Sequence, residues 1–231
     1  MKLNLLFSQQ KQKFIDESNN REDREVVKFL NTLAKDKPWK YLEVGSGLGR
    51  FSLKVKNLFQ NINIECFEIN PDLAKITSDK GLKTTVGNAI DMSYPDESFD
   101  VVHCSHVIEH FKYPEVTELL DQLMRVTKTS GYIIIRSPLW YPGFYLDIDH
   151  IRPYPPETIL SYFKNKQQQK IGTGNLEIIN CWYRRENYKI FNIGSSKIKY
   201  FFNALLAFSW TYIKFPFSKK NGYVLILRKI N

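Results

Sequence analysis

The sequence is poor in cysteine and has no long hydrophobic run. Its three cysteines, Cys66, Cys104 and Cys181, are odd in number and widely spaced, so disulfides are not indicated and a reducing cytoplasm is expected. The longest stretch without a charged residue, 200–213, has 14 residues and is too short to cross a bilayer. The apolar stretch at the N-terminus is shorter than a signal-peptide core and lacks a small-residue cleavage site, so no secretion signal is expected.

Acidic residues are scarce in the C-terminal part of the chain. Residues 131–231 hold 15 Lys and Arg against five Asp and Glu, whereas residues 1–130 hold 18 against 19. The net charge of +9 therefore belongs to the C-terminal part. A basic surface favours an anionic partner such as nucleic acid, an anionic membrane or a phosphorylated substrate. An ordinary solvated surface would explain the same charge.

The apolar pattern alternates between short strands and helices, without repeats or low-complexity segments. Such alternation predicts an α/β fold in which a doubly wound, mostly parallel sheet carries helices on both faces. Helices are expected at 14–35, 49–59, 71–80, 113–128 and 155–164, and strands at 40–44, 62–69, 82–86, 98–105, 130–138, 175–187 and 222–230.

The chain is expected to form a single domain. A helical lead at 1–37 precedes a half at 38–137, to which the motifs described below assign cofactor binding. A second half at 138–231 follows, expected on the substrate side, with an apolar and basic insertion at about 197–220.

A glycine-rich loop lies in the stretch YLEVGSGLGRF, at the end of the first predicted strand. Gly45, Gly47 and Gly49 permit positive φ and a close approach of a ligand to the backbone, and the next helix presents free N–H groups. The spacing G-x-G-x-G departs from the dinucleotide pattern G-x-G-x-x-G. Glu68 ends the second strand, where a carboxylate can accept hydrogen bonds from ribose hydroxyls. The pattern indicates a nucleoside-containing cofactor.

The segments EVGSGLG, ECFEIN and GNAIDMSYPDESFDVV follow one another in an order that resembles the class I S-adenosylmethionine-dependent methyltransferases. The resemblance covers about 38–137 and implies a Rossmann-like sheet of about seven strands with an antiparallel, inserted last strand. It also implies S-adenosylmethionine as cofactor. The glycines would line its methionine and ribose end, and Asn88 stands where many members have Asp. The cofactor residues implied are Glu43 near the amino group, Gly45, Gly47, Gly49, Glu68 at the ribose, Asn88 and Ala89 at the adenine, and His106.

The stretch HVIEH, 106–110, matches the H-x-x-E-H pattern of some zinc enzymes. Zinc there requires both histidines on one helix face and a third ligand, whereas this stretch directly follows a strand. We therefore expect no metal. His106 is expected to contact the cofactor, and Glu109 and His110 to be substrate-side groups or the start of the next helix.

The segment DIDHIRPYPPETI, 147–159, resembles a D-x-x-H-x-R-P-Y/F segment of methyltransferases associated with surface-polysaccharide and other glycan assembly. The enzyme mainly aligns the acceptor with the activated methyl group, and a base helps when the acceptor is a hydroxyl. His150 is the candidate base, oriented by Asp149 or Asp147, and Arg152 could bind a carboxylate or phosphate. Alternatively, these side chains only fix a proline-rich loop.

The uncharged run at 200–213 is rich in aromatic residues and flanked by lysines. This pattern is typical of a segment lying on an anionic membrane, which would place a cytoplasmic enzyme at the inner membrane face. A buried helix or a dimer contact is equally consistent with the composition. A lipid-linked glycan acceptor would explain the apolar run and the positive charge together.

The leading hypothesis is methyl transfer from S-adenosylmethionine to oxygen on a sugar or glycan intermediate. An alternative acceptor is a quinone, a lipid or another small molecule. Nucleic acid is disfavoured because no Asn/Asp-Pro-Pro-aromatic motif follows the fourth strand. A third hypothesis is a cofactor-binding or scaffold protein without catalysis, against which the intact glycine and Glu68 positions argue.

Overall fold

The protein's structure, a computed structural model, describes residues 21–33, 38–164, 176–187, 197–209, 212 and 218–230. Of the predicted helix at 14–35, residues 21–30 are helical, and those before 21 lie outside the described ranges. The remaining elements are β1 (Trp39–Val44), α2 (Arg50–Leu58), β2 (Ile62–Glu68), α3 (Pro71–Asp79), β3 (Lys83–Val86), β4 (Phe99–Ser105), η1 (Ile108–His110), α4 (Glu115–Val126), β5 (Thr127–Pro138), η2 (Phe144–Leu146), α5 (Pro156–Phe163), β6 (Leu176–Asn187), α6 (Lys197–Phe208) and β7 (Ser218–Lys229).

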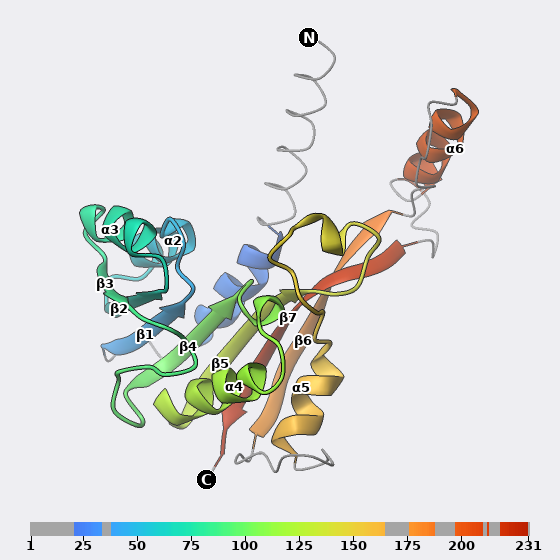
Figure 1. The fold of residues 1–231 in the computed structure, drawn as a ribbon. Helices are drawn as coiled ribbons and strands as arrows, with labels where there is room; N and C mark the ends of the chain where they lie inside the picture. The colour runs from blue at the N-terminus through green and yellow to red at the C-terminus, as the bar shows by residue number, and fades with distance from the viewer. Residues whose placement is uncertain are drawn as a thin grey trace.

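The strands form one seven-stranded sheet with the order β3-β2-β1-β4-β5-β7-β6. Strands β1 to β5 pair in parallel, and β7 is inserted antiparallel between β5 and β6. This arrangement, visible in Figure 1, confirms the predicted doubly wound sheet with an antiparallel last strand. Because the carboxyl ends of parallel strands share one edge, the loops after β1, β2 and β4 meet there.

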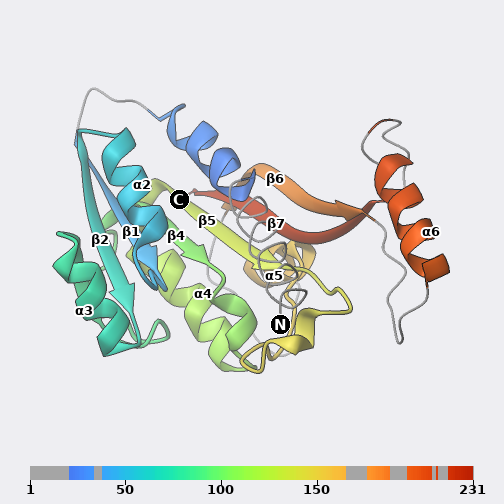
Figure 2. The ribbon, with the colours of Figure 1, turned by 90° about the horizontal axis from the view of Figure 1, so that it is seen from above.

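Each face of the sheet is covered by helices, as Figure 2 shows. Tyr41 of β1 packs on the side of the helix at 21–30 and of α2, in a core that includes Leu30 and Val55. Leu42 and Val44 face the opposite core, which α4 and α5 cover. The alternation of side chains along a strand therefore separates two apolar cores.

A buried network of charges attaches the helix at 21–30 to the sheet. Glu22 and Asp23 are fully buried, and the Arg136 guanidinium of β5 donates to Glu22 at 2.9 Å and to Asp23 at 3.1 Å. Arg50 donates to Asp23 at 2.6 Å, and Arg184 of β6 lies 3.1 Å from Glu22. Burial would raise the pKa of both carboxyl groups, but hydrogen bonds and positive charges outweigh it and lower both pKa values.

We expect Arg136→Met to lower the free energy of unfolding by about 3 kcal/mol, because it leaves two buried carboxylates short of a partner. The matched control is Lys128→Met, which removes a half-exposed pair with Asp100 and should cost at most about 1 kcal/mol. Urea unfolding followed by tryptophan fluorescence measures both. Equal losses for the two variants would show that the network does not stabilise the fold as described.

Candidate functional site

The glycine loop joins β1 to α2 in a conformation that suits glycine. Gly45, Gly47 and Gly49 all have positive φ, at 72°, 52° and 71°. A Cβ on Gly45 would overlap the side chain of Val107, and one on Gly49 would lie 2.9 Å from a Thr77 side-chain atom. A Cβ on Gly47 would meet nothing within 4 Å. The loop is therefore closely packed at both ends and open at its centre.

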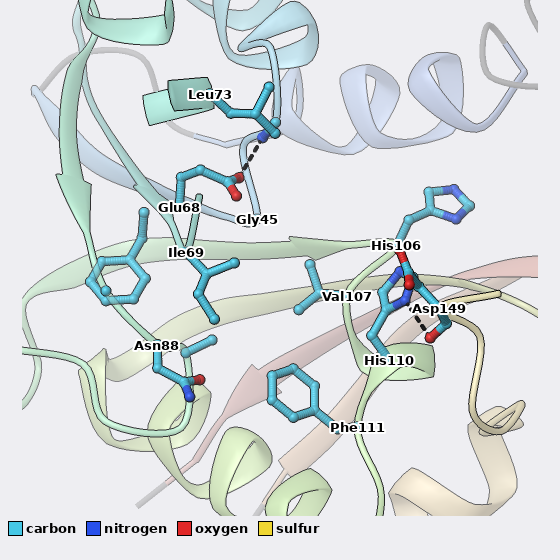
Figure 3. A pocket seen from close by; sticks show the side chains of 14 residues that line it. Gly45, Glu68, Ile69, Leu73, Asn88, His106, Val107, His110, Phe111 and Asp149 are labelled. Atoms are coloured by element: carbon cyan, nitrogen blue, oxygen red, sulfur yellow. Dashed lines mark hydrogen bonds between the residues drawn. The ribbon is translucent and has the colours of Figure 1, made fainter. Parts of the chain in front are cut away.

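Glu68, at the end of β2, holds this loop from the neighbouring strand. Its carboxylate accepts hydrogen bonds from the backbone N–H of Gly47 at 2.8 Å and of Asn70 at 3.1 Å. The side chain is almost fully buried. The carboxylate is therefore fixed beside the centre of the glycine loop. Figure 3 shows Glu68 with the hydrogen bond that it accepts from the loop.

A cavity of about 500 Å³ opens beside the loop, at the carboxyl edge of the sheet. This volume lies in the usual range for small-molecule sites. Its walls are mostly apolar, with a few polar groups at each end. The lining residues are Gly45, Gly47, Phe67, Glu68, Ile69, Leu73, Gly87, Asn88, Ala89, His106, Val107, His110, Phe111 and Asp149.

The cavity brings together most of the residues predicted to bind a cofactor. Its lining includes the predicted residues Gly45, Gly47, Glu68, Asn88, Ala89 and His106. Figure 3 shows Glu68 and Asn88 on one side and His110 with Asp149 on the other. Gly49 does not line the cavity and instead precedes the first turn of α2.

Glu43 lies elsewhere than the sequence predicted. It shares a face of β1 with Tyr41, so it points into the core beneath α2 and does not line the cavity. Its Oε2 accepts from the Tyr41 hydroxyl at 2.7 Å and from Nδ1 of His103 at 2.9 Å. Burial and the Glu43 charge raise the pKa of Tyr41 well above its usual range. The structure therefore gives Glu43 a supporting position under the loop.

His106 lies at the wall of the cavity between two buried carboxylates. Its Nε2 lies 3.2 Å from Glu22 and its Nδ1 lies 3.2 Å from Glu109. Burial would lower the pKa of His106, but these two carboxylates outweigh it and raise the pKa to about 9. Figure 3 shows its ring turned away from Asn88 and Phe111. Sequence reasoning missed Glu22, which is 84 residues away.

Two further histidines meet on the side of the cavity opposite Glu68. Nδ1 of His110 lies 2.9 Å from the Asp149 carbonyl oxygen, and Nδ1 of His150 lies 2.8 Å from the Phe144 carbonyl oxygen. The two ring centroids are 5.2 Å apart. A carbonyl oxygen can only accept, so both Nδ1 atoms carry hydrogen, and in the neutral ring the lone pair is then on Nε2.

The predicted acceptor-side residues are only partly at the cavity. Asp149 lines it, whereas His150 lies one layer behind His110. Asp147 is the carboxylate nearest His150, at 3.7 Å from Nε2. Arg152 is exposed, with its guanidinium 5.7 Å from the Tyr154 ring centroid. The base role of His150 and the anion-binding role of Arg152 stay predictions.

We expect Glu68→Ala to weaken binding of S-adenosylhomocysteine, the demethylated form of the expected cofactor, by about 5- to 150-fold. Losing a buried carboxylate partner typically costs about 1–3 kcal/mol. Glu65→Ala is the matched control, because Glu65 lies on the same strand and pairs with Lys83 away from the cavity. Calorimetry measures both, and equal affinities in the two variants would refute the role of Glu68.

Comparisons with known proteins agree with this geometry. Residues 42–135 match the family model described as methyltransferase domain. Ajmaline N-methyltransferase of Rauvolfia serpentina is 35% identical over 155 residues, which are 64% of this chain and 47% of that protein. Demethylmenaquinone methyltransferase of Deinococcus radiodurans is 24% identical over 151 residues, 54% of this chain and 62% of that protein. The chain thus spans about half to three fifths of the length of these relatives.

The solved structures show the same fold. The crystal structure of an S-adenosylmethionine-dependent methyltransferase from Archaeoglobus fulgidus has a TM-score of 0.61 and 24% identity, covering 90% of this chain and 92% of that one. The match to the family model contains the glycine loop, Glu68, all of β2, β3 and β4, the second half of β1 and most of β5. Residues 42–135 are thus similar to a methyltransferase domain, and the fold of the chain is that of a solved S-adenosylmethionine-dependent methyltransferase.

Proposed function

We propose that the protein transfers a methyl group from S-adenosylmethionine to a small-molecule acceptor. The observation that carries this proposal is a single cavity with two different ends. One end contains the glycine loop, Glu68 and Asn88, and the other contains His110 and Asp149. A cofactor and an acceptor can meet in such a space, and the family match supports the identity of the cofactor.

The residues at the first end fit this cofactor. Gly47 leaves open space where any other residue would place a Cβ, so the ligand can reach the backbone. Glu68 would bind the ribose hydroxyls, and Asn88 and Ala89 would contact the adenine. Bound there, S-adenosylmethionine supplies a methyl group activated by its sulfonium.

The residues at the other end would position the acceptor. Val107 and Phe111 line the wall between the two ends and exclude water from the centre of the cavity. His110, with His150 behind it, offers free Nε2 atoms to an acceptor hydroxyl. Because alignment of the reacting groups supplies much of the rate, this rigid wall would be the main contribution of the protein.

The acceptor we favour carries a hydroxyl group, because free imidazole nitrogens suit a group that loses a proton. A sugar or glycan intermediate is the narrower proposal and rests on the segment 147–159 and its exposed Arg152. The two relatives are named for methylation of ajmaline nitrogen and of demethylmenaquinone, which supports a small molecule and keeps quinone as the second candidate. A scaffold without catalysis would bind the cofactor and transfer nothing.

The experiment follows labelled methyl from S-adenosylmethionine to a panel of nucleotide sugars, quinols and amines. We expect a hydroxyl acceptor to be labelled, and His150→Ala to lower turnover by about 10²–10⁴-fold, as for loss of a group that handles the acceptor proton. Cofactor affinity should not change. Ile148→Ala, in the same loop and exposed, is the control. If the turnover of His150→Ala stays within a few-fold of wild type, His150 is not the base and its loop has only a structural role.

The helix α6 supports a location at a membrane surface. Figures 1 and 2 show α6 beyond the ends of β6 and β7, away from the helices that cover the sheet. Its apolar side chains Phe201, Phe202, Leu205 and Phe208 are exposed, which does not fit a buried core helix. Residues 164–231 carry 13 Lys and Arg against two acids. Of the helices in the described ranges, none is long and apolar enough to cross a membrane.

We expect the protein to float with anionic vesicles at low salt and not with neutral ones, because each near-surface charge contributes about 1 kcal/mol. The combined variant Phe201→Ser, Phe202→Ser, Leu205→Ser should lose this binding. Leu58→Ser with Ile76→Ser, exposed on α2 and α3, is the control. If the wild-type protein does not float with anionic vesicles at low salt, the proposed membrane location is overturned.

A further inference from the structure

We propose that Glu109, His110 and His150 bind a divalent first-row metal ion at the acceptor end of the cavity. Each of the three side chains offers one donor atom, and these atoms all lie within 4.8 Å of one another. The site itself stands on this geometry, and the role given to the ion below rests on the proposed function.

The three donors come from two segments that the backbone ties together. Glu109 and His110 belong to the short helix η1, and His150 lies in the loop after η2. The backbone carbonyl of Glu109 accepts hydrogen bonds from the N–H groups of Ile151 at 2.9 Å and Arg152 at 3.3 Å. The His110 side chain in turn donates to the Asp149 carbonyl. The loop is therefore held against η1 at the point where the donors meet.

Both histidines have the hydrogen-bond arrangement of metal ligands. In metal sites the ring nitrogen that does not bind the ion usually donates to a carbonyl or carboxylate, which fixes the ring and its tautomer. Nδ1 of His110 donates to the Asp149 carbonyl and Nδ1 of His150 to the Phe144 carbonyl, at 2.9 and 2.8 Å. Each ring therefore has Nε2 as its available ligand atom.

The carboxylate of Glu109 is buried and fixed in place. The residue is fully buried, and its Oε2 accepts from the Ser137 hydroxyl at 3.1 Å. Its Oε1 lies 3.2 Å from Nδ1 of His106. A carboxylate has about four lone-pair positions, so these two contacts leave room for Glu109 to bind an ion as well.

Two imidazoles and one carboxylate form a common ligand set for first-row divalent metals, with open positions for other ligands. Ligands at about 2.0–2.2 Å from an ion lie about 3.0–3.5 Å apart, so donors now up to 4.8 Å apart would close by at most about 1.3–1.8 Å on binding. Asp149 lines the cavity next to His110, and Asp147 lies 3.7 Å from Nε2 of His150.

This set differs from the one that the sequence pattern H-x-x-E-H offers. His106 is excluded as a ligand because its two nitrogens face Glu22 and Glu109. Its place is taken by His150, which is distant in sequence. The expectation of no metal concerned His106 and His110 as a pair on one helix face, which a stretch directly after a strand does not offer. Our proposal uses His150 in place of His106.

An ion at this place would act on the acceptor. His110 and Asp149 line the cavity, so the open positions of the ion would face the space where the acceptor binds. With both Nε2 atoms bound to the ion, the ion would replace the imidazoles as the group that activates the acceptor. A hydroxyl oxygen on the ion would lose its proton to water more readily, because the positive charge stabilises the alkoxide. The ligand class implied is an acceptor with one or two neighbouring hydroxyl groups.

The experiment uses the untagged full chain, stripped with EDTA and dialysed, and titrates Co²⁺ by visible absorption and Zn²⁺ by calorimetry. We expect one saturable ion per chain and a loss of affinity of at least about 100-fold in His110→Ala with His150→Ala. Glu109→Gln should also weaken metal binding. Glu177→Gln is the control, because it removes the same charge from an exposed position on β6 and should leave metal affinity unchanged. His150→Gln replaces the double variant if thermal melting shows the latter unfolded.

S-adenosylhomocysteine is titrated into the same samples, because its binding tests the proposed function independently of the metal site. If the protein binds S-adenosylhomocysteine but shows no saturable binding of Co²⁺ or Zn²⁺, the metal site is overturned and the proposed function stands. Equal metal affinity in wild type and the histidine variants would have the same meaning. Metal binding without binding of the nucleoside would support the metal site and overturn the proposed function.

Discussion

The buried guanidinium of Arg136, held between Glu22 and Asp23, is the interaction that connects the fold to its site. It joins the helix at 21–30 to the carboxyl end of β5. Glu22 also contacts His106, which follows β4, and His106 contacts Glu109 of η1. Alternating charges thus run from the N-terminal helix to the acceptor end of the cavity. Such a buried network is stable only when every member is paired, which restricts how these elements can sit.

The two ends of the cavity are built in different ways. The cofactor end depends on neighbouring strands, because β1 and β2 pair in parallel and bring the glycine loop next to Glu68. The acceptor end depends on a contact between η1 and a loop some 40 residues later, made by backbone hydrogen bonds to Glu109. The first arrangement follows from the sheet, whereas the second can vary with the loop.

This difference explains how much could be predicted from the sequence. Strand and helix positions follow from local periodicity, and the structure places these elements as expected. Motifs with short spacing point to Gly45, Gly47, Glu68 and Asn88, which all line the cavity, whereas Gly49 does not. Glu43 was misplaced because the motif gives its position along β1 but not the face it occupies, which it shares with Tyr41. Glu22 and the meeting of His110 with His150 depend on contacts distant in sequence, for which a single sequence has no signal. Two adjacent acids in an otherwise amphipathic helix were the one local hint of the buried network.

The most direct measurement is a crystal structure of the protein with S-adenosylhomocysteine. The account predicts ribose hydroxyls on the Glu68 carboxylate, the adenine beside Asn88 and Ala89, and the sulfur directed towards the wall formed by His106 and His110. A ligand bound elsewhere, or one whose ribose does not contact Glu68, would contradict the assignment of this cavity as the site of methyl transfer.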